Sequence, residues 1–177
     1  HYYTAANAPE LRTFEGYEYW VVAGGGEPEG AEYTEAVGAL YKAAYGVKKV
    51  AKGVGVDFVV PKLEGLWWVD SDLPPLTVPR EEWLWELMIR IPEGVTEEML
   101  AGVDKPVEVR RLVEGLSIQV LHVGPYADEP ETLGRMEAFM AAEGLAMNGR
   151  HHEIYLTDPR KGGAAMKTIL RHPVRKE

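Results

Sequence analysis

The segment His151–Leu156, near the end of the chain, holds two side chains that could do chemistry together. Its alternation of polar and apolar residues predicts a β-strand, in which successive side chains point to opposite faces. Glu153 and Tyr155 would share one face, and Ile154 would lie on the other, which we expect to pack against a helix. The carboxylate could attract a cation, orient water or act as a general base, with the tyrosine as hydrogen-bond donor. An ordinary solvated sheet face has the same pattern, so the spacing alone leaves both interpretations open.

Several aromatic residues elsewhere offer surfaces on which a flat or cationic ligand could stack. Trp67 and Trp68 are adjacent, so they cannot both face the core side of a regular strand. Tyr126 follows a Gly-Pro pair where a strand gives way to a helix, and either a groove rim or packing within the loop fits that position. Tyr41 lies one helical turn from Tyr45, a spacing that is more typical of packing between the two rings than of ligand contact. We keep all four as candidate ligand contacts.

Other kinds of site lack a recognisable motif. The chain has no cysteine, which excludes disulfides, thiolate nucleophiles and cysteine-ligated metals. His151 and His152 would point to opposite faces of a strand and no second pattern completes a metal site, so we predict no metal and no cofactor. The three glycines at 24–26 lack the lysine of a phosphate-binding loop, and Ser71 and Ser117 stand outside any nucleophile elbow.

Composition predicts a soluble, cytoplasmic protein with one domain over residues 1–177. The chain of 177 residues is 46% hydrophobic, enough for one core without staples. A net charge of −9 disfavours nucleic acid as a partner, because phosphate binding depends on clustered Lys and Arg. Membrane partners are also not expected, because no apolar run approaches the roughly 20 residues needed to span a bilayer.

The elements that would position these residues occur in two similar halves, at about 14–93 and about 106–174. Each half reads as strand, helix, strand, strand, and the closing strands share a pattern at Met88–Pro92 and Ile169–Pro173. The predicted fold class is α+β: duplicated strand-helix-strand-strand (SHS2-like) modules with pseudo-two-fold symmetry, antiparallel sheets and a ligand groove. The predicted strands are 18–23, 57–61, 65–69, 83–91, 116–123, 151–157 and 166–171; the predicted helices are 31–52 and 128 to about 143, with caps at Asp128 and Gly144.

Four motifs in this order resemble the GyrI-like small-molecule-binding family, which is related to the effector domains of multidrug-responsive transcription regulators. The motifs are Phe58–Trp68, His122–Tyr126, Gly149–Arg160 and Lys167–Arg171. The resemblance implies two such modules around a pseudo-two-fold axis, with a groove for bulky, often cationic, aromatic compounds. It also implies that Glu153 lies in the pocket. Some similar free-standing members hydrolyse cyclopropane-containing compounds with a pocket carboxylate, a tyrosine and aromatic walls, for which Glu153, Tyr155 or Tyr126, Trp67 and Trp68 are the matching residues.

Two functions therefore compete. The leading prediction is a free-standing protein that binds or sequesters a hydrophobic, cationic or planar aromatic compound. The alternative is a hydrolase that detoxifies cyclopropane-containing electrophiles, with Glu153 activating water and a tyrosine donating a proton. An adaptor that blocks a protein partner is a third, weaker prediction. The natural ligand and the oligomeric state are not predicted.

Overall fold

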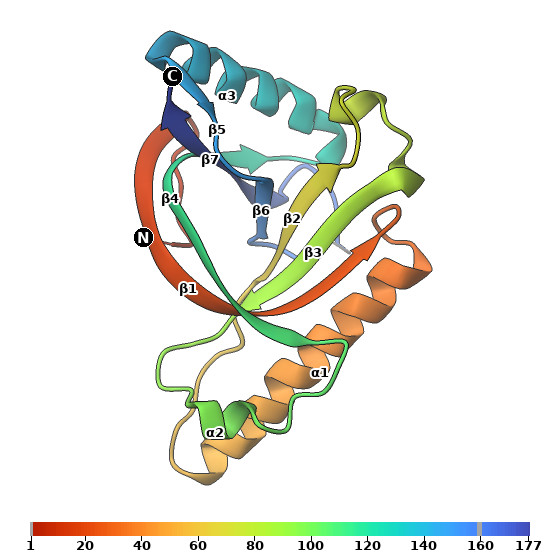
Figure 1. The fold of residues 1–177 in the computed structure, drawn as a ribbon, viewed down its shortest axis with the longest axis vertical. Helices are drawn as coiled ribbons and strands as arrows, with labels where there is room; N and C mark the ends of the chain where they lie inside the picture. Colours follow the sequence, from red (N-terminus) through yellow and green to blue (C-terminus); the bar gives the residue numbers. More distant parts are fainter. Residues whose placement is uncertain (1, 159–160) are drawn as a thin grey trace. The chain divides into compact units, whose positions relative to one another are not determined.

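A computed structural model describes residues 2–158 and 161–177 (Figure 1). His1 lies outside this range, as do Pro159 and Arg160, which end one of the family motifs. The chain forms two compact units, which we call the middle unit (17–112) and the terminal unit (1–16 with 113–177). The boundaries fall inside two 16-residue strands, β1 (Glu10–Gly25) and β4 (Glu108–Val123).

The middle unit places one long helix against an antiparallel sheet. After β1 come α1 (Ala31–Gly53), β2 (Leu63–Val69), the short 3-10 helices η1 (Pro75–Thr77) and η2 (Arg80–Glu82), β3 (Trp83–Arg90) and α2 (Glu97–Leu100). Strand β3 pairs antiparallel with β1 on one side and β2 on the other. Helix α1 packs on β3 because its buried residues recur every three or four positions. Gly24 is needed where β1 ends, because a Cβ there would lie 2.4 Å from the Trp85 ring.

The terminal unit has a second helix over a second set of antiparallel strands. After β4 come η3 (Tyr126–Asp128), α3 (Glu129–Glu143), β5 (Leu145–Met147), β6 (His151–Tyr155) and β7 (Lys167–Lys176). Strand β7 pairs antiparallel with β4, β5 and β6. Met136 and Met140 of α3 pack into one core cluster with Val120 of β4 and Leu170 of β7. Gly144 ends α3 in the left-handed conformation (φ 65°), as a glycine cap requires.

The two units share their strand order and a matching register. In each unit the last long strand lies between the first and the second, so the order is first, third, second. Arg90 of β3 lies opposite Tyr19 of β1, and Arg171 of β7 lies opposite Gln119 of β4. In each unit, therefore, an arginine of the central strand is paired with a residue of the first strand.

The α+β class with antiparallel strands is confirmed, and several boundaries differ from expectation. Residues 57–61 were predicted as a strand but form none: Val59 is 88% exposed, so this apolar run has no sheet to join. Strands β1 and β4 begin earlier than predicted, and neither α2 nor β5 was expected. Asp128 precedes α3 as expected, but its side chain makes no capping hydrogen bond. None of the helices in the described residues is long and apolar enough to cross a membrane.

Candidate functional site

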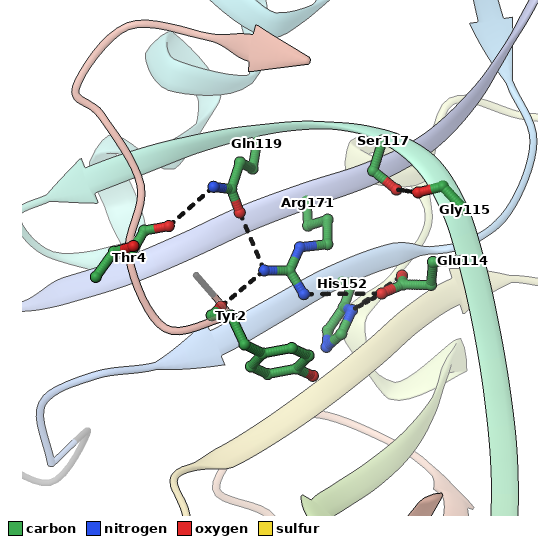
Figure 2. Close-up of polar contacts among 8 residues, drawn as sticks. All are labelled: Tyr2, Thr4, Glu114, Gly115, Ser117, Gln119, His152 and Arg171. Carbon is green, nitrogen blue, oxygen red and sulfur yellow. Dashed lines mark hydrogen bonds and ion pairs between the residues drawn. The ribbon is translucent and has the colours of Figure 1, made fainter. Parts of the chain in front are cut away.

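Strand β6 presents Glu153 and Tyr155 to the face that carries α3, opposite to the orientation expected from the sequence. Glu153 lies opposite Leu170 in the β6–β7 register, and Leu170 belongs to the core cluster under α3. Ile154 lies opposite Ile169 on the other face. That second face is buried too, with His152 near Arg171 in a network of polar contacts (Figure 2). The expectation was wrong because both faces of β6 are covered, so polarity does not reveal which one bears the helix.

Glu153 is the centre of a compact hydrogen-bonded cluster. Its Oε2 lies 2.7 Å from Nε2 of His151, and the hydroxyl of Tyr155 donates to its Oε1 at 3.1 Å. Glu129, the first residue of α3, brings a carboxyl oxygen within 4.8 Å of the ligand atoms of His151 and Glu153. The Tyr126 ring meets the Tyr155 ring edge-on, with 6.1 Å between centroids. The predicted residues Glu153, Tyr155 and Tyr126 are thus brought together, and His151 and Glu129 join them.

Two further histidines hold this cluster in place. Nε2 of His172 lies 2.7 Å from Nδ1 of His151, which leaves the opposite nitrogen of His151 directed at Glu153. His122 contacts Thr132 Oγ1 of α3 through Nδ1 at 2.7 Å and the Pro125 carbonyl through Nε2 at 3.0 Å. It therefore ties the start of α3 to the turn before it. Sequence reasoning assigned no role to either histidine.

Electrostatics favour one proton shared by Glu129 and Glu153. Burial, followed by the charge of Glu153, raises the pKa of Glu129. Burial alone would raise the pKa of Glu153 as well, but the hydrogen bond and charge of His151, with hydrogen bonds from Glu129 and Tyr155, outweigh it and lower that pKa. A helix N-terminus favours an anion by about 0.3–1 kcal/mol, whereas two like charges about 4 Å apart repel by about 4 kcal/mol at an effective dielectric constant of about 20. Glu129 therefore keeps its proton.

His172 joins the cluster as a neutral imidazole. Burial, with the charge of His151 as the second cause, lowers its pKa to about 3, although the charge of Glu153 acts in the opposite direction. Its Nδ1 is buried without a hydrogen-bond partner. A neutral His172 can accept at Nε2 a hydrogen bond from Nδ1 of a charged His151, which donates from its own Nε2 to Glu153.

Replacing His172 by glutamine is expected to make stability less sensitive to acid. The folded protein binds this proton with a pKa of about 3, whereas the unfolded chain binds it at about 6.5, so acid favours unfolding. As the pH falls below about 6.5, this group removes roughly 1.4 kcal/mol of stability per pH unit, until the folded protein is protonated too. Urea unfolding at about pH 7, 6 and 5 measures the slope. Equal slopes for the wild type and His172→Gln would contradict a neutral, buried His172.

The same cluster contains the group of described residues that could hold a metal ion. Glu129, His151 and Glu153 each bring one ligand atom within 4.8 Å of the others. The contact between His151 and Glu153 is a hydrogen bond in the structure, and a metal ion would have to displace the proton that Glu129 holds. The expectation of no metal and no cofactor stays a prediction.

The other predicted ligand contacts lie in the middle unit. Trp67 stacks on Tyr33 with 6.1 Å between centroids and meets Trp83 edge-on at 6.1 Å. Trp68 is half-buried, and Tyr41 lies 6.4 Å from Tyr45, as expected for residues one helical turn apart. Ligand binding by Trp67, Trp68 and Tyr41 stays a prediction.

Comparison with known proteins places this fold in a family. A crystal structure of a hydrolase from Listeria innocua is 39% identical, with a TM-score of 0.84 over 98% of this chain and 95% of that one. An uncharacterized conserved protein from the same organism is also 39% identical, with a TM-score of 0.88 over the same shares. The C-terminal domain of EcmrR shares the fold at 11% identity, with a TM-score of 0.61 over 96% of this chain and 98% of that one.

No curated protein matches the sequence. The family model described as the GyrI-like small molecule binding domain matches residues 8–172. Because that match covers most of the sequence, the chain belongs to the GyrI-like small-molecule-binding domain family.

Proposed function

We propose that this protein is a hydrolase that opens a reactive, cyclopropane-containing electrophile with water. The observation that carries the proposal is the meeting of the Glu153 and Glu129 carboxyl groups in one buried cluster, where the pKa of Glu129 is raised and that of Glu153 is lowered. A base and an acid held side by side are what addition of water to an electrophile requires. The 39% identity to a structure named a hydrolase supports the same class of reaction.

Glu153 would orient the attacking water and accept its proton. With three donors its carboxylate is a weak base, because each hydrogen bond stabilises the ionised form. A substrate oxygen that takes the Tyr155 hydroxyl away from Glu153 would remove one donor and make the carboxylate more basic. Binding of the substrate and activation of water would thereby be coupled. Tyr155, whose hydroxyl donates to Glu153, suits this role better than Tyr126, whose ring meets the Tyr155 ring edge-on.

The contacts of Glu153 also weaken the leading prediction of a protein that only sequesters cations. Its charge is already met by His151, Tyr155 and Glu129, so little of it is left to attract a cationic ligand. Sequestration of a hydrophobic or planar aromatic compound remains the second candidate function. It is favoured by the half-buried Trp67, stacked on Tyr33, and by Tyr126, which is 37% exposed.

We also propose that the middle and terminal units are copies of one strand-helix-strand-strand module. Their common strand order supports this, as do the matching positions of Arg90 and Arg171 opposite the first strand of each unit. A pseudo-two-fold axis and a ligand groove remain predictions that follow from this duplication.

The test of hydrolysis is turnover of a cyclopropane conjugated with a carbonyl group. We expect the ring-opened, hydrated product to accumulate over many turnovers, as followed by mass spectrometry and by the change in ultraviolet absorbance. Buffer alone and heat-unfolded protein give the background rate. Quenching of tryptophan fluorescence by the compound, with intact compound recovered after long incubation, would contradict hydrolysis and support sequestration.

A further inference from the structure

We propose that Glu129 is the catalytic acid of this site and that its proton returns from Glu153 after each turnover. This inference rests on the proposed hydrolase function and deepens it, because it assigns the proton donor. Sequence reasoning considered only a tyrosine for that task.

The backbone around Glu129 is held in place by its neighbours. It is the first residue of α3, directly after η3, and Pro130 fixes the backbone of the first helical turn. His122 bonds both Thr132 in that turn and the Pro125 carbonyl before it. The side chain of Glu129 is 8% exposed, yet its Oε2 has no hydrogen-bond partner. A buried carboxyl oxygen of this kind has unused hydrogen-bonding capacity.

The carboxyl groups of Glu129 and Glu153 meet in one buried cluster, with ligand atoms within 4.8 Å of one another, so a proton between them relieves the repulsion of two buried carboxylates. Two carboxylates offer only acceptors, so a bond forms only when one of the two is a carboxylic acid. Glu153 also receives the Tyr155 hydroxyl and contacts His151, which is backed by His172 on β7, so the negative charge is best placed on Glu153. Glu129 has no such set of donors among the described residues, so the acidic proton belongs to it.

The reaction balances within this pair. The oxygen of water bonds to a ring carbon, the strained carbon–carbon bond breaks, and its electron pair passes through the conjugated system to the carbonyl oxygen. Glu129 gives its proton to that oxygen while Glu153 takes one from water. Loss of the hydrogen bond from Glu129 makes Glu153 more basic at the moment it must accept a proton. The proton then crosses from Glu153 to Glu129 and restores both groups.

This arrangement selects a chemical class of substrate. It suits an uncharged electrophile whose breaking bond leaves electrons on an oxygen that must be protonated. The proton donor therefore suits the carbonyl-conjugated cyclopropanes of the proposed function.

Glu129→Gln tests the assignment, because glutamine keeps the size of the side chain and an N–H donor toward Glu153 but cannot release a proton. Two probes are compared: a carbonyl-conjugated cyclopropane, and a derivative whose electron-withdrawing substituents stabilise the oxyanion formed on ring opening. We expect kcat to fall about 100-fold or more on the first probe and only a few-fold on the second. Glu131→Gln, an exposed glutamate on the same helix, is the matched control and is expected to leave both rates unchanged.

A second readout does not depend on turnover. At neutral pH the infrared spectrum of the folded protein should contain the carbonyl band of a protonated carboxylic acid, which Glu129→Gln removes and Glu131→Gln retains. No lost band, an equal loss of rate on the two probes, or full activity of Glu129→Gln would each overturn the role of Glu129 while hydrolysis stands. A wild-type protein that turns over neither probe would instead refute the proposed function, and the catalytic role of Glu129 with it.

Discussion

Replacing Glu153 by glutamine is expected to lower kcat for a carbonyl-conjugated cyclopropane by about 10²–10⁴-fold, the usual contribution of a general base. Glutamine has nearly the same shape, and its carbonyl oxygen can still accept from Tyr155 and Glu129. It cannot take a proton from water, so the chemical step should suffer while the substrate still binds. Steady-state kinetics separates the two effects, and tryptophan fluorescence measures binding independently.

The matched control for this experiment is Glu131→Gln, which removes the same charge from an exposed position in the terminal unit. Its kcat and KM should equal those of the wild type. A Glu153→Gln protein that keeps its kcat but binds a cationic aromatic dye more weakly would show that Glu153 anchors cations, and the sequestering function would then be preferred. Circular dichroism of each variant checks that the fold is retained.

The spacing of apolar residues predicted those helices and strands that are packed against a neighbouring element along most of their length. Helix α1 was expected at 31–52 and spans Ala31–Gly53, because its apolar residues recur at helical spacing. Strand β3 was likewise expected, since it is buried along most of its length. The strand predicted around Val59 was wrong. A short apolar run looks like a strand in any sequence, but it forms one only where a neighbouring strand pairs with it. Strand β5 has three residues, too few to show a period.

Half of the candidate site could be read from one strand, and half could not. The spacing of Glu153 and Tyr155 on β6 was enough to place them side by side. Glu129 lies more than 20 residues earlier, and its meeting with Glu153 depends on how α3 begins and crosses the sheet. No local pattern carries that information. The sequence did single out the segment that contains His172, because Ile169–Pro173 shares a pattern with Met88–Pro92. Only the strand register of β7 shows that His172 faces His151.

The buried face opposite α3 centres on a fully buried arginine (Figure 2). Nη2 of Arg171 donates to the Tyr2 carbonyl at 2.9 Å and to Gln119 Oε1 at 3.0 Å, and Nη1 lies 3.8 Å from Glu114. The guanidinium also lies over the Phe14 ring, 3.6 Å from its centroid. Burial alone would raise the pKa of Glu114, but His152 and Arg171 outweigh it and lower that pKa. The charges on this face are therefore mutually dependent.

Arg171→Met is consequently expected to destabilise the protein by about 3–5 kcal/mol, the usual cost of removing one partner from a buried ion pair. Methionine fills much of the space, so most of the loss should come from leaving the Glu114 carboxylate short of positive charge rather than from a cavity. Arg90→Met is the control, because Arg90 holds the matching register position in the middle unit but is only half-buried. Urea unfolding at neutral pH should show a clearly smaller loss for that variant.

The double variant Arg171→Met with Glu114→Gln separates electrostatic loss from lost packing. If the cost comes from an uncompensated carboxylate, making Glu114 neutral should recover a substantial part of the stability that Arg171→Met removes. The glutamine that replaces Glu114 can still accept a hydrogen bond from His152 through its side-chain carbonyl, so that contact need not be lost with the charge. A double variant as unstable as the sum of the two single ones would mean that Arg171 acts through its contacts with Tyr2, Gln119 and Phe14. In that case the arginine would stabilise the face by holding the N-terminal segment in place, and its charge would matter little.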